Sequence, residues 1–164
     1  MWICTGAASW GSLDGVVHAR VTEELPATCE AAFDLVHDYE RRLRWDTLLS
    51  QAYVEGGGAA GEGKIAVCSG RWFLGGLTLR TEYVSFTRGE VAAVKMIDRA
   101  PFFDRWAASI RHEPAGEGRS RITYTYNFRA RPRLLAFVLE PILALVFRWE
   151  TRRRLRALRR ALAP

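Results

Sequence analysis

Short strand-like segments joined by short turns fill most of the chain between residues 52 and 131. Six segments show the alternation and the β-branched and aromatic residues that are typical of strands: 52–55, 64–69, 77–86, 91–97, 105–113 and 120–131. Glycine-bearing turns at 87–90 and 115–118 join neighbouring segments. Because parallel strands need a crossover of about a dozen residues or more, connections this short predict an antiparallel sheet.

The last of these segments has the clearest two-sided pattern. Polar Thr123, Thr125, Asn127 and Arg129 alternate with residues of the opposite face, which are Ile122, Tyr124, Tyr126 and Phe128. Successive side chains of a strand point to opposite faces, so one face of this strand is largely aromatic. An aromatic face of a sheet is expected to be covered by another element.

Before the sheet segments, the sequence predicts one strand and two short helices. Residues 17–21 alternate as a half-buried strand does, and Pro26 ends the pattern. Thr28 is a typical helix cap with Glu30 in the first turn, and the apolar positions Ala32, Phe33 and Val36 share one face of the helix. A second short helix is expected over residues 39–48.

After the sheet segments, the sequence predicts a long C-terminal helix that begins near Pro132. We expect its apolar stripe to cover the aromatic sheet face through Val138, Ile142, Leu145, Trp149, Leu155, Leu158 and Leu162. Pro141 lies inside this pattern, so either the helix kinks there or a short helix precedes a longer one. A kink would hold part of the helix away from the sheet, leaving a cavity of roughly 300 to 1,000 Å³ beside Tyr124 and Tyr126.

Length and composition favour one globular domain. A chain of 164 residues with 49% hydrophobic residues can bury a single core, and we assign residues 15–164 to one domain and 1–14 to a flexible leader. Three cysteines, Cys4, Cys29 and Cys68, are too few and too scattered for a disulfide framework. The apolar run 134–147 is short for a membrane-spanning helix. With no signal-peptide pattern at the start, a cytoplasmic location is expected.

The net charge of +6 comes from the last helix. Seven arginines lie between Arg148 and Arg160 against the single Glu150, and this excess accounts for the whole net charge. Most such runs are solvated faces. Otherwise the helix spanning residues 148–160 would attract an anionic membrane surface or an acidic partner. Nucleic acid is disfavoured because the aromatic residues are expected on the opposite, buried side of the helix and not between the arginines as a stacking platform requires.

The order of elements resembles the helix-grip fold of the START-like superfamily. The matching segments are 17–26, 32–36 and 38–42, then Trp45-Asp46, and later 77–82 and 122–126. The residues of these segments are similar to those of the polyketide cyclase/dehydrase and lipid-transport family. The resemblance implies an α+β fold in which a curved antiparallel sheet of six to seven strands wraps around a long C-terminal helix and encloses an apolar pocket.

The candidate ligand-binding residues are large apolar side chains on the covered sheet face, on the last helix, and in two apolar loops at 71–74 and 100–103, together with Trp45 after the short helices, which the resemblance places at one end of the pocket. They are Trp45, Trp72, Phe73, Phe102, Phe103, Trp106, Ile110, Tyr124, Tyr126, Phe128, Val138 and Ile142. Each is also a normal core residue. Buried tyrosine hydroxyls need partners, which strengthens the case for Tyr124 and Tyr126.

Motifs for other chemistry are weak. The glycines at 56–61 match the dinucleotide-binding pattern G-x-G-x-x-G in spacing alone, because a strand is expected after them where that motif requires a helix. His18, His37 and His112 lack metal-ligand spacing, and Cys68 with His112 is the only pair that the sheet might bring together as nucleophile and base. We therefore assign no catalytic or metal-binding residues and no cofactor.

Three functions fit these observations. The preferred one is binding or carriage of a hydrophobic small molecule such as a lipid, a quinone or a polyketide-like compound. The second is an aromatase/cyclase-type enzyme that uses the same pocket and whose candidate proton-moving groups are Tyr124, Tyr126, Arg111 and His112. The third is a protein-interaction module with a collapsed pocket.

Overall fold

A computed structural model describes residues 16–71, 77–101 and 103–163. The predicted leader and the candidate residues Trp72, Phe73 and Phe102 lie outside these ranges. Within them the elements follow in the order β1 (Val17–Leu25), α1 (Cys29–His37), α2 (Tyr39–Trp45), β2 (Leu49–Val54), β3 (Ile65–Gly70), β4 (Thr78–Thr87), β5 (Val91–Met96), β6 (Phe103–Pro114), β7 (Ser120–Ala130), the 3₁₀ turn η2 (Arg133–Leu135) and α3 (Ala136–Ala161).

The strands form one antiparallel sheet in the order β1-β7-β6-β5-β4-β3-β2. Each strand from β2 to β7 pairs with its neighbour in sequence, and β1 closes the order by pairing along β7 from Val17↔Phe128 to Leu25↔Ser120. The predicted meander and its strand segments are therefore confirmed, with boundaries that move by one to three residues.

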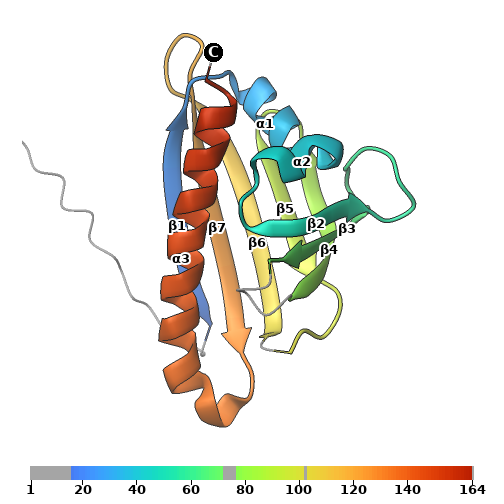
Figure 1. Cartoon of the computed structure of the whole chain (residues 1–164), viewed down its shortest axis with the longest axis vertical. Helices are drawn as coiled ribbons and strands as arrows, with labels where there is room; N and C mark the ends of the chain where they lie inside the picture. Colours follow the sequence, from blue (N-terminus) through green and yellow to red (C-terminus); the bar gives the residue numbers. More distant parts are fainter. Residues whose placement is uncertain (1–15, 72–76, 102, 164) are drawn as a thin grey trace, which may run out of the picture.

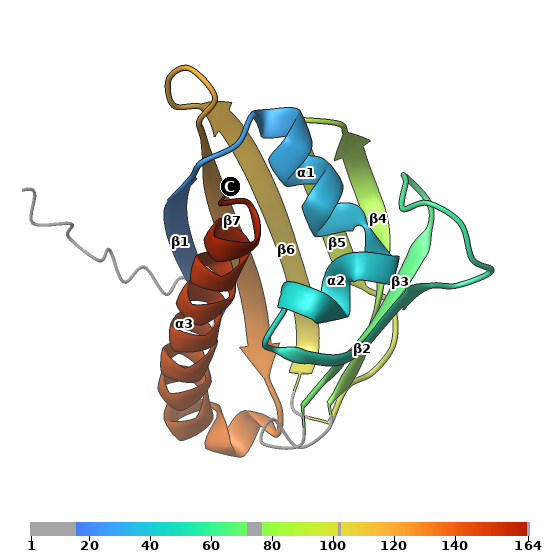
Figure 2. The same ribbon diagram turned by 45° about the horizontal axis from the view of Figure 1, so that its top comes forward.

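The sheet is curved, and all the labelled helices lie on its concave side (Figures 1 and 2). Helix α3 runs along β1 and β7, while α1 contacts β6 and β7 and α2 contacts β2. This arrangement is the helix-grip fold expected from the sequence. The aromatic face of β7 is buried as predicted, with Tyr126 and Phe128 each about 1% exposed.

The short helices begin at side-chain caps. Thr28 Oγ1 accepts a hydrogen bond from the amide of Ala31, and Asp38 Oδ1 accepts one from the amide of Arg41 at 3.0 Å. These caps satisfy amides that have no partner within the helix. They fix where α1 and α2 begin, and α2 carries Arg42, which is buried at the cavity.

Helix α3 continues through Pro141 without interruption, and η2 is the short helical piece that precedes it. Pro141 lies in the second turn, where its missing amide removes one hydrogen bond. No helix of the described residues is long and apolar enough to cross a membrane.

Candidate functional site

A cavity of about 430 Å³ lies between the concave sheet face and α3. The sheet contributes an apolar wall, and α3 closes the opposite side with Leu143, Val146 and Phe147. Leu77, Leu79, Val94, Phe103, Trp106, Ala108 and Ile110 form most of the sheet wall. The cavity predicted from the sequence is therefore present, beside Tyr124 and Tyr126.

The twelve candidate residues separate into four groups. Phe103, Trp106, Ile110, Tyr124 and Tyr126 line the cavity. Trp45 and Phe128 are buried in the neighbouring core and do not line it. Val138 and Ile142 are 43% and 53% exposed on the outside of α3, and the remaining three residues lie outside the described ranges.

The expected apolar stripe of α3 is wrong in its first half. Val138, Ile142, Leu145 and Trp149 all face outward, whereas Leu155 and Leu158 are buried. Trp149 and Leu155 are six residues apart, which is about 240° around a helix with 3.6 residues per turn. The predicted stripe therefore joined two opposite faces, and the inward face runs through Ala144, Phe147, Thr151, Leu155, Leu158 and Leu162.

One end of the cavity carries a buried ionic cluster. Oδ2 of Asp46 lies 3.2 Å from Nε of Arg42 and 2.7 Å from Nε of Arg154, and all three residues are under 9% exposed. Arg42 also donates a 2.5 Å hydrogen bond to the carbonyl of Val36. The two arginines line the cavity and share a single carboxylate. Because a guanidinium carries five N–H donors, the pair retains capacity to bind an acceptor on a ligand.

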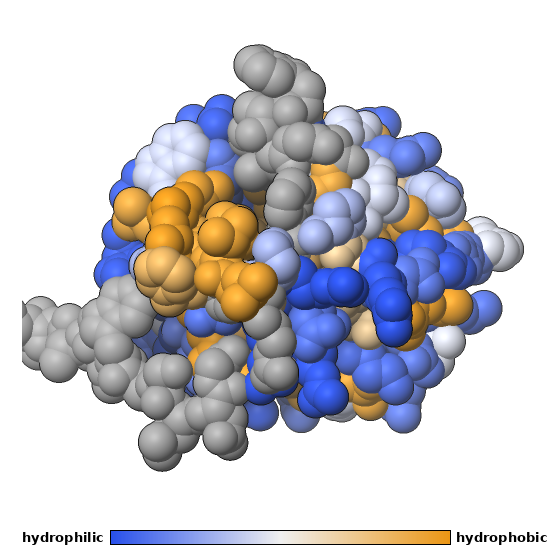
Figure 3. Space-filling model, turned by 90° about the horizontal axis from the view of Figure 1, so that it is seen from below, coloured by the Kyte–Doolittle hydropathy of each residue, from blue (hydrophilic) through white to orange (hydrophobic). Residues whose placement is uncertain are grey.

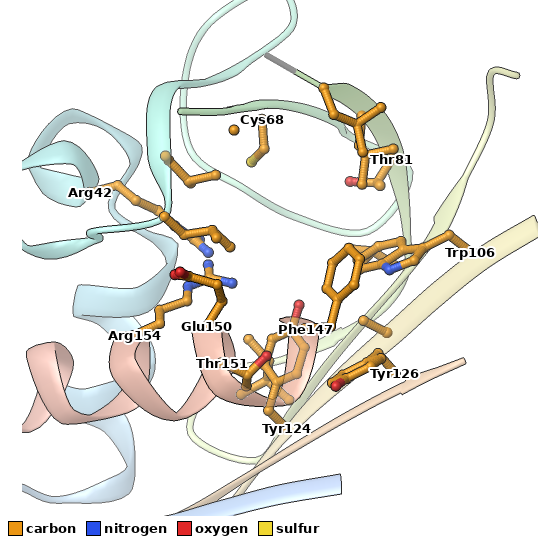
Figure 4. Close-up of a pocket in the computed structure, with 18 of the residues that line it drawn as sticks. Arg42, Cys68, Thr81, Trp106, Tyr124, Tyr126, Phe147, Glu150, Thr151 and Arg154 are labelled. Atoms are coloured by element: carbon orange, nitrogen blue, oxygen red, sulfur yellow. The ribbon is translucent and has the colours of Figure 1, made fainter. Parts of the chain in front are cut away.

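Glu150 lies at the same end of the cavity (Figure 4). The residue is 2% exposed, and neither carboxylate oxygen makes a hydrogen bond to a described residue. Nη1 of Arg153 lies 3.8 Å from its Oε1. Burial raises the pKa of Glu150 above its usual value. A buried carboxyl without hydrogen bonds is unfavourable on its own, so this group has unused capacity to bind a donor.

The two cavity tyrosines differ in their surroundings. The guanidinium of Arg154 lies 5.6 Å from the ring centre of Tyr124, and burial raises the pKa of that phenol. The hydroxyl of Tyr126 has no hydrogen-bond partner among the described residues, and burial raises its pKa to about 12. Both phenols are therefore neutral near pH 7 and present O–H groups toward the cavity (Figure 4).

The structure keeps the other candidate catalytic groups apart from one another, and of these only Cys68 lines the cavity among the described residues. Cys68 on β3 and His112 on β6 are three strands apart, which is about 14 Å at normal strand spacing. His112 packs edge-on against Phe33, 5.6 Å between ring centres, and Arg111 faces solvent. The nucleophile and base pair considered from the sequence is therefore wrong. Among the described residues no three side chains of metal-binding type converge.

Sequence reasoning missed the charged end of the cavity. It named Asp46 only as part of the Trp45-Asp46 match, and in the structure its side chain also accepts a hydrogen bond from the amide of Leu48 at 3.2 Å. Glu150 and Arg154 lay inside an arginine-rich run that suggested a solvated face. Their helical phase was the available signal, because both share the inward side of α3 with Phe147 and Leu158.

The sheet and the helix across its concave face define a helix-grip protein with an internal cavity. A model of the polyketide cyclase/dehydrase and lipid transport family matches residues 16–163, so the chain belongs to that family. A search of curated proteins found none that is similar in sequence.

Several solved structures share the fold at low sequence identity. An aromatase/cyclase from Streptomyces sp. R1128 superposes with a TM-score of 0.74 at 14% identity, over 87% of this chain and 91% of that one. The di-domain aromatase/cyclase of the steffimycin biosynthetic pathway gives 0.75 at 14% identity, over 92% of this chain and 51% of its own. A START superfamily protein from Mycobacterium smegmatis gives 0.59 at 12%, over 82% and 95%. At these identities the likeness concerns the fold.

Proposed function

We propose that the protein binds and carries a hydrophobic small molecule, such as a lipid, a quinone or a polyketide-like compound, in the cavity under α3. The observation that carries this proposal is the cavity itself, which joins a long apolar wall to one charged end. Its volume of about 430 Å³ lies in the range of small-molecule sites, which usually combine apolar walls with a few polar groups.

The charged end restricts the ligand to an amphiphile. Arg42 and Arg154 are buried, share one carboxylate and border the cavity. A hydrocarbon at this position would leave guanidinium donors without acceptors, which is unfavourable away from water. A ligand with a carboxylate, phosphate or carbonyl at one end would supply those acceptors, while its apolar part would lie against the sheet wall.

A second candidate function is an aromatase/cyclase-type reaction, which the cavity position of Glu150 and Tyr124 favours. Ring closure of a poly-β-ketone and loss of water require groups that donate and accept protons. The raised pKa of the buried Glu150 favours its protonated form relative to an exposed glutamate. The two aromatase/cyclases that share the fold support this candidate by analogy only.

Protection of Cys68 tests the binding proposal. Cys68 lines the cavity, whereas Cys29 lies on α1 outside it, so one chain contains both the reporter and its control. Palmitate should slow alkylation of Cys68 by iodoacetamide at least about tenfold and leave Cys29 unchanged, as measured by peptide mass spectrometry.

Hexadecane is the matched probe without an anionic end. It should protect Cys68 less than palmitate because it offers no acceptor to Arg42 and Arg154. If no apolar or amphiphilic compound protects Cys68 while Cys29 reacts normally, the carrier proposal is wrong.

A further inference from the structure

The outward face of α3 is apolar along its first half. Seven large apolar side chains of η2 and the first half of α3 are between 43% and 88% exposed, and we call them together the apolar outer face: Leu134 and Leu135 of η2, and Phe137, Val138, Ile142, Leu145 and Trp149 of α3. Figure 3 shows hydrophobic side chains gathered in a patch at this end of the molecule, beside a strongly hydrophilic area. Contiguous exposed apolar surface of this kind usually marks an interaction site.

Arginines continue the same face along the second half of the helix. Arg152, Arg153 and Arg156 lie within about 60° of the direction that Val138, Ile142, Leu145 and Trp149 share, at 100° per residue. The guanidinium of Arg153 lies 5.6 Å from the ring centre of Trp149, where the two halves of the face meet. Along its length, the outside of α3 therefore changes from apolar to cationic.

Some of these arginines have no carboxylate to neutralise them. Within the part of the chain that the structure describes, Arg148, Arg152 and Arg156 form no ion pair. Other exposed arginines of the described residues include paired ones, such as Arg88 with Asp34, and unpaired ones, such as Arg20 and Arg44, but these two are not next to the exposed hydrocarbon of α3. The face thus offers unpaired positive charge next to exposed hydrocarbon, and this combination matches the charge and polarity of an anionic bilayer surface.

The apolar outer face is also continuous with the cavity. Val146 lines the cavity and is itself 37% exposed, and it follows Leu145 of the apolar outer face directly. Leu143 lines the cavity next to Ile142 in the same way. The two turns of α3 that bear the exposed hydrocarbon therefore also form the cavity wall.

We propose that this face docks on an anionic lipid bilayer. The apolar outer face enters the interfacial region, Trp149 lies at its polar boundary, and Arg152, Arg153 and Arg156 contact lipid phosphates. Docking would set the cavity wall against the bilayer. Entry of a hydrophobic ligand from that bilayer rests on the proposed function. A second copy of the chain fits the face less well, because pairing two such faces brings unpaired arginines together.

Flotation with vesicles tests the docking proposal. Wild-type protein should float with vesicles that contain phosphatidylglycerol and much less with vesicles of phosphatidylcholine alone, and high salt should weaken the binding. The variants Arg152→Glu/Arg156→Glu and Phe137→Gln/Leu145→Gln should each lower the bound fraction at least about tenfold. The charge control is Arg20→Glu/Arg44→Glu, and the apolar control is Tyr53→Gln/Val84→Gln, all on exposed positions away from α3. Both control variants should bind as wild type does.

The same variants separate docking from ligand binding. Palmitate should still protect Cys68 in the two α3 variants, because their substitutions face away from the cavity. Docking is contradicted if the α3 variants and their controls float equally with anionic vesicles. It is also contradicted if the wild-type protein sediments as a dimer without vesicles and Phe137→Gln/Leu145→Gln converts that dimer to a monomer. If palmitate fails to protect Cys68 in the wild-type protein while that protein still floats with anionic vesicles, only the carrier proposal is contradicted.

Discussion

Nε of Arg154 on α3 lies 2.7 Å from Oδ2 of Asp46, the residue that ends α2. This ion pair ties the C-terminal helix to the helical segment on the other side of the cavity. Since Asp46 is about 1% exposed, water does not replace the contact when it is lost. The charged end of the cavity is therefore both a candidate ligand contact and a structural link.

Replacing Asp46 by Asn should lower the free energy of unfolding by about 3 kcal/mol, because it leaves Arg42 and Arg154 buried without a carboxylate. Urea denaturation measures the change. Asp34→Asn is the matched control, since its ion pair with Arg88 is largely exposed and should contribute less than about 1 kcal/mol. Equal losses in the two variants would contradict a structural role for the buried cluster.

Stability should fall as the pH drops from 7 to 5, and His112 should account for part of the fall. Burial lowers the pKa of His37 to about 3 and that of His112 to about 4, from an ordinary value of 6.5. Between pH 6.5 and about 4 the unfolded chain therefore binds protons that the folded chain excludes. Each histidine should remove about 2 kcal/mol of stability at pH 5 relative to pH 7.

His112→Phe keeps an aromatic ring beside Phe33 and removes this titration. Its loss of stability between pH 7 and pH 5 should be smaller than that of the wild type by about 2 kcal/mol, as measured by urea denaturation at both pH values. The comparison between the two proteins cancels the contribution of the carboxylates. An unchanged pH dependence would show that His112 is protonated in the folded chain at pH 5.

Tyr124→Phe distinguishes the carrier from the enzyme. The substitution keeps the ring against Arg154 and deletes only the hydroxyl, so a carrier should lose no more than about 1 kcal/mol of binding free energy. An enzyme that uses this phenol to transfer a proton should lose about 100-fold in rate while it still binds. If the wild-type protein turns over a polyketide and Tyr124→Phe nearly abolishes that turnover, the second candidate function is favoured over carriage.

The sequence predicted the sheet well because strand alternation is local. The strand segments, the burial of Tyr124 and Tyr126, and the Thr28 cap all follow from residues within one strand or one turn. The pairing of β1 with β7 joins segments far apart in the sequence, and no local pattern predicts it. The phase of α3 was predicted poorly because apolar residues occupy both sides of its first half. Hydrophobic periodicity cannot distinguish a core face from a docking face when both are apolar.

The charged part of the site was less predictable for a different reason. Arg42, Asp46 and Arg154 meet only after α2 and α3 converge on the concave sheet face, although Asp46 and Arg154 are more than a hundred residues apart in the sequence. No local pattern identifies which arginine of a run turns inward. The inward phase of Arg154 becomes evident once Leu158 is known to be buried.

Native mass spectrometry of the purified protein tests the central claim most directly. Wild type should carry an additional small-molecule mass that denaturation releases. Ala108→Phe, which places a ring into the cavity from β6, should lack that mass while its circular dichroism stays that of the wild type. Phe137→Gln/Leu145→Gln, which alters only the outside of α3, should retain it. A wild-type protein without any bound molecule, or the same bound mass in Ala108→Phe, would contradict the account.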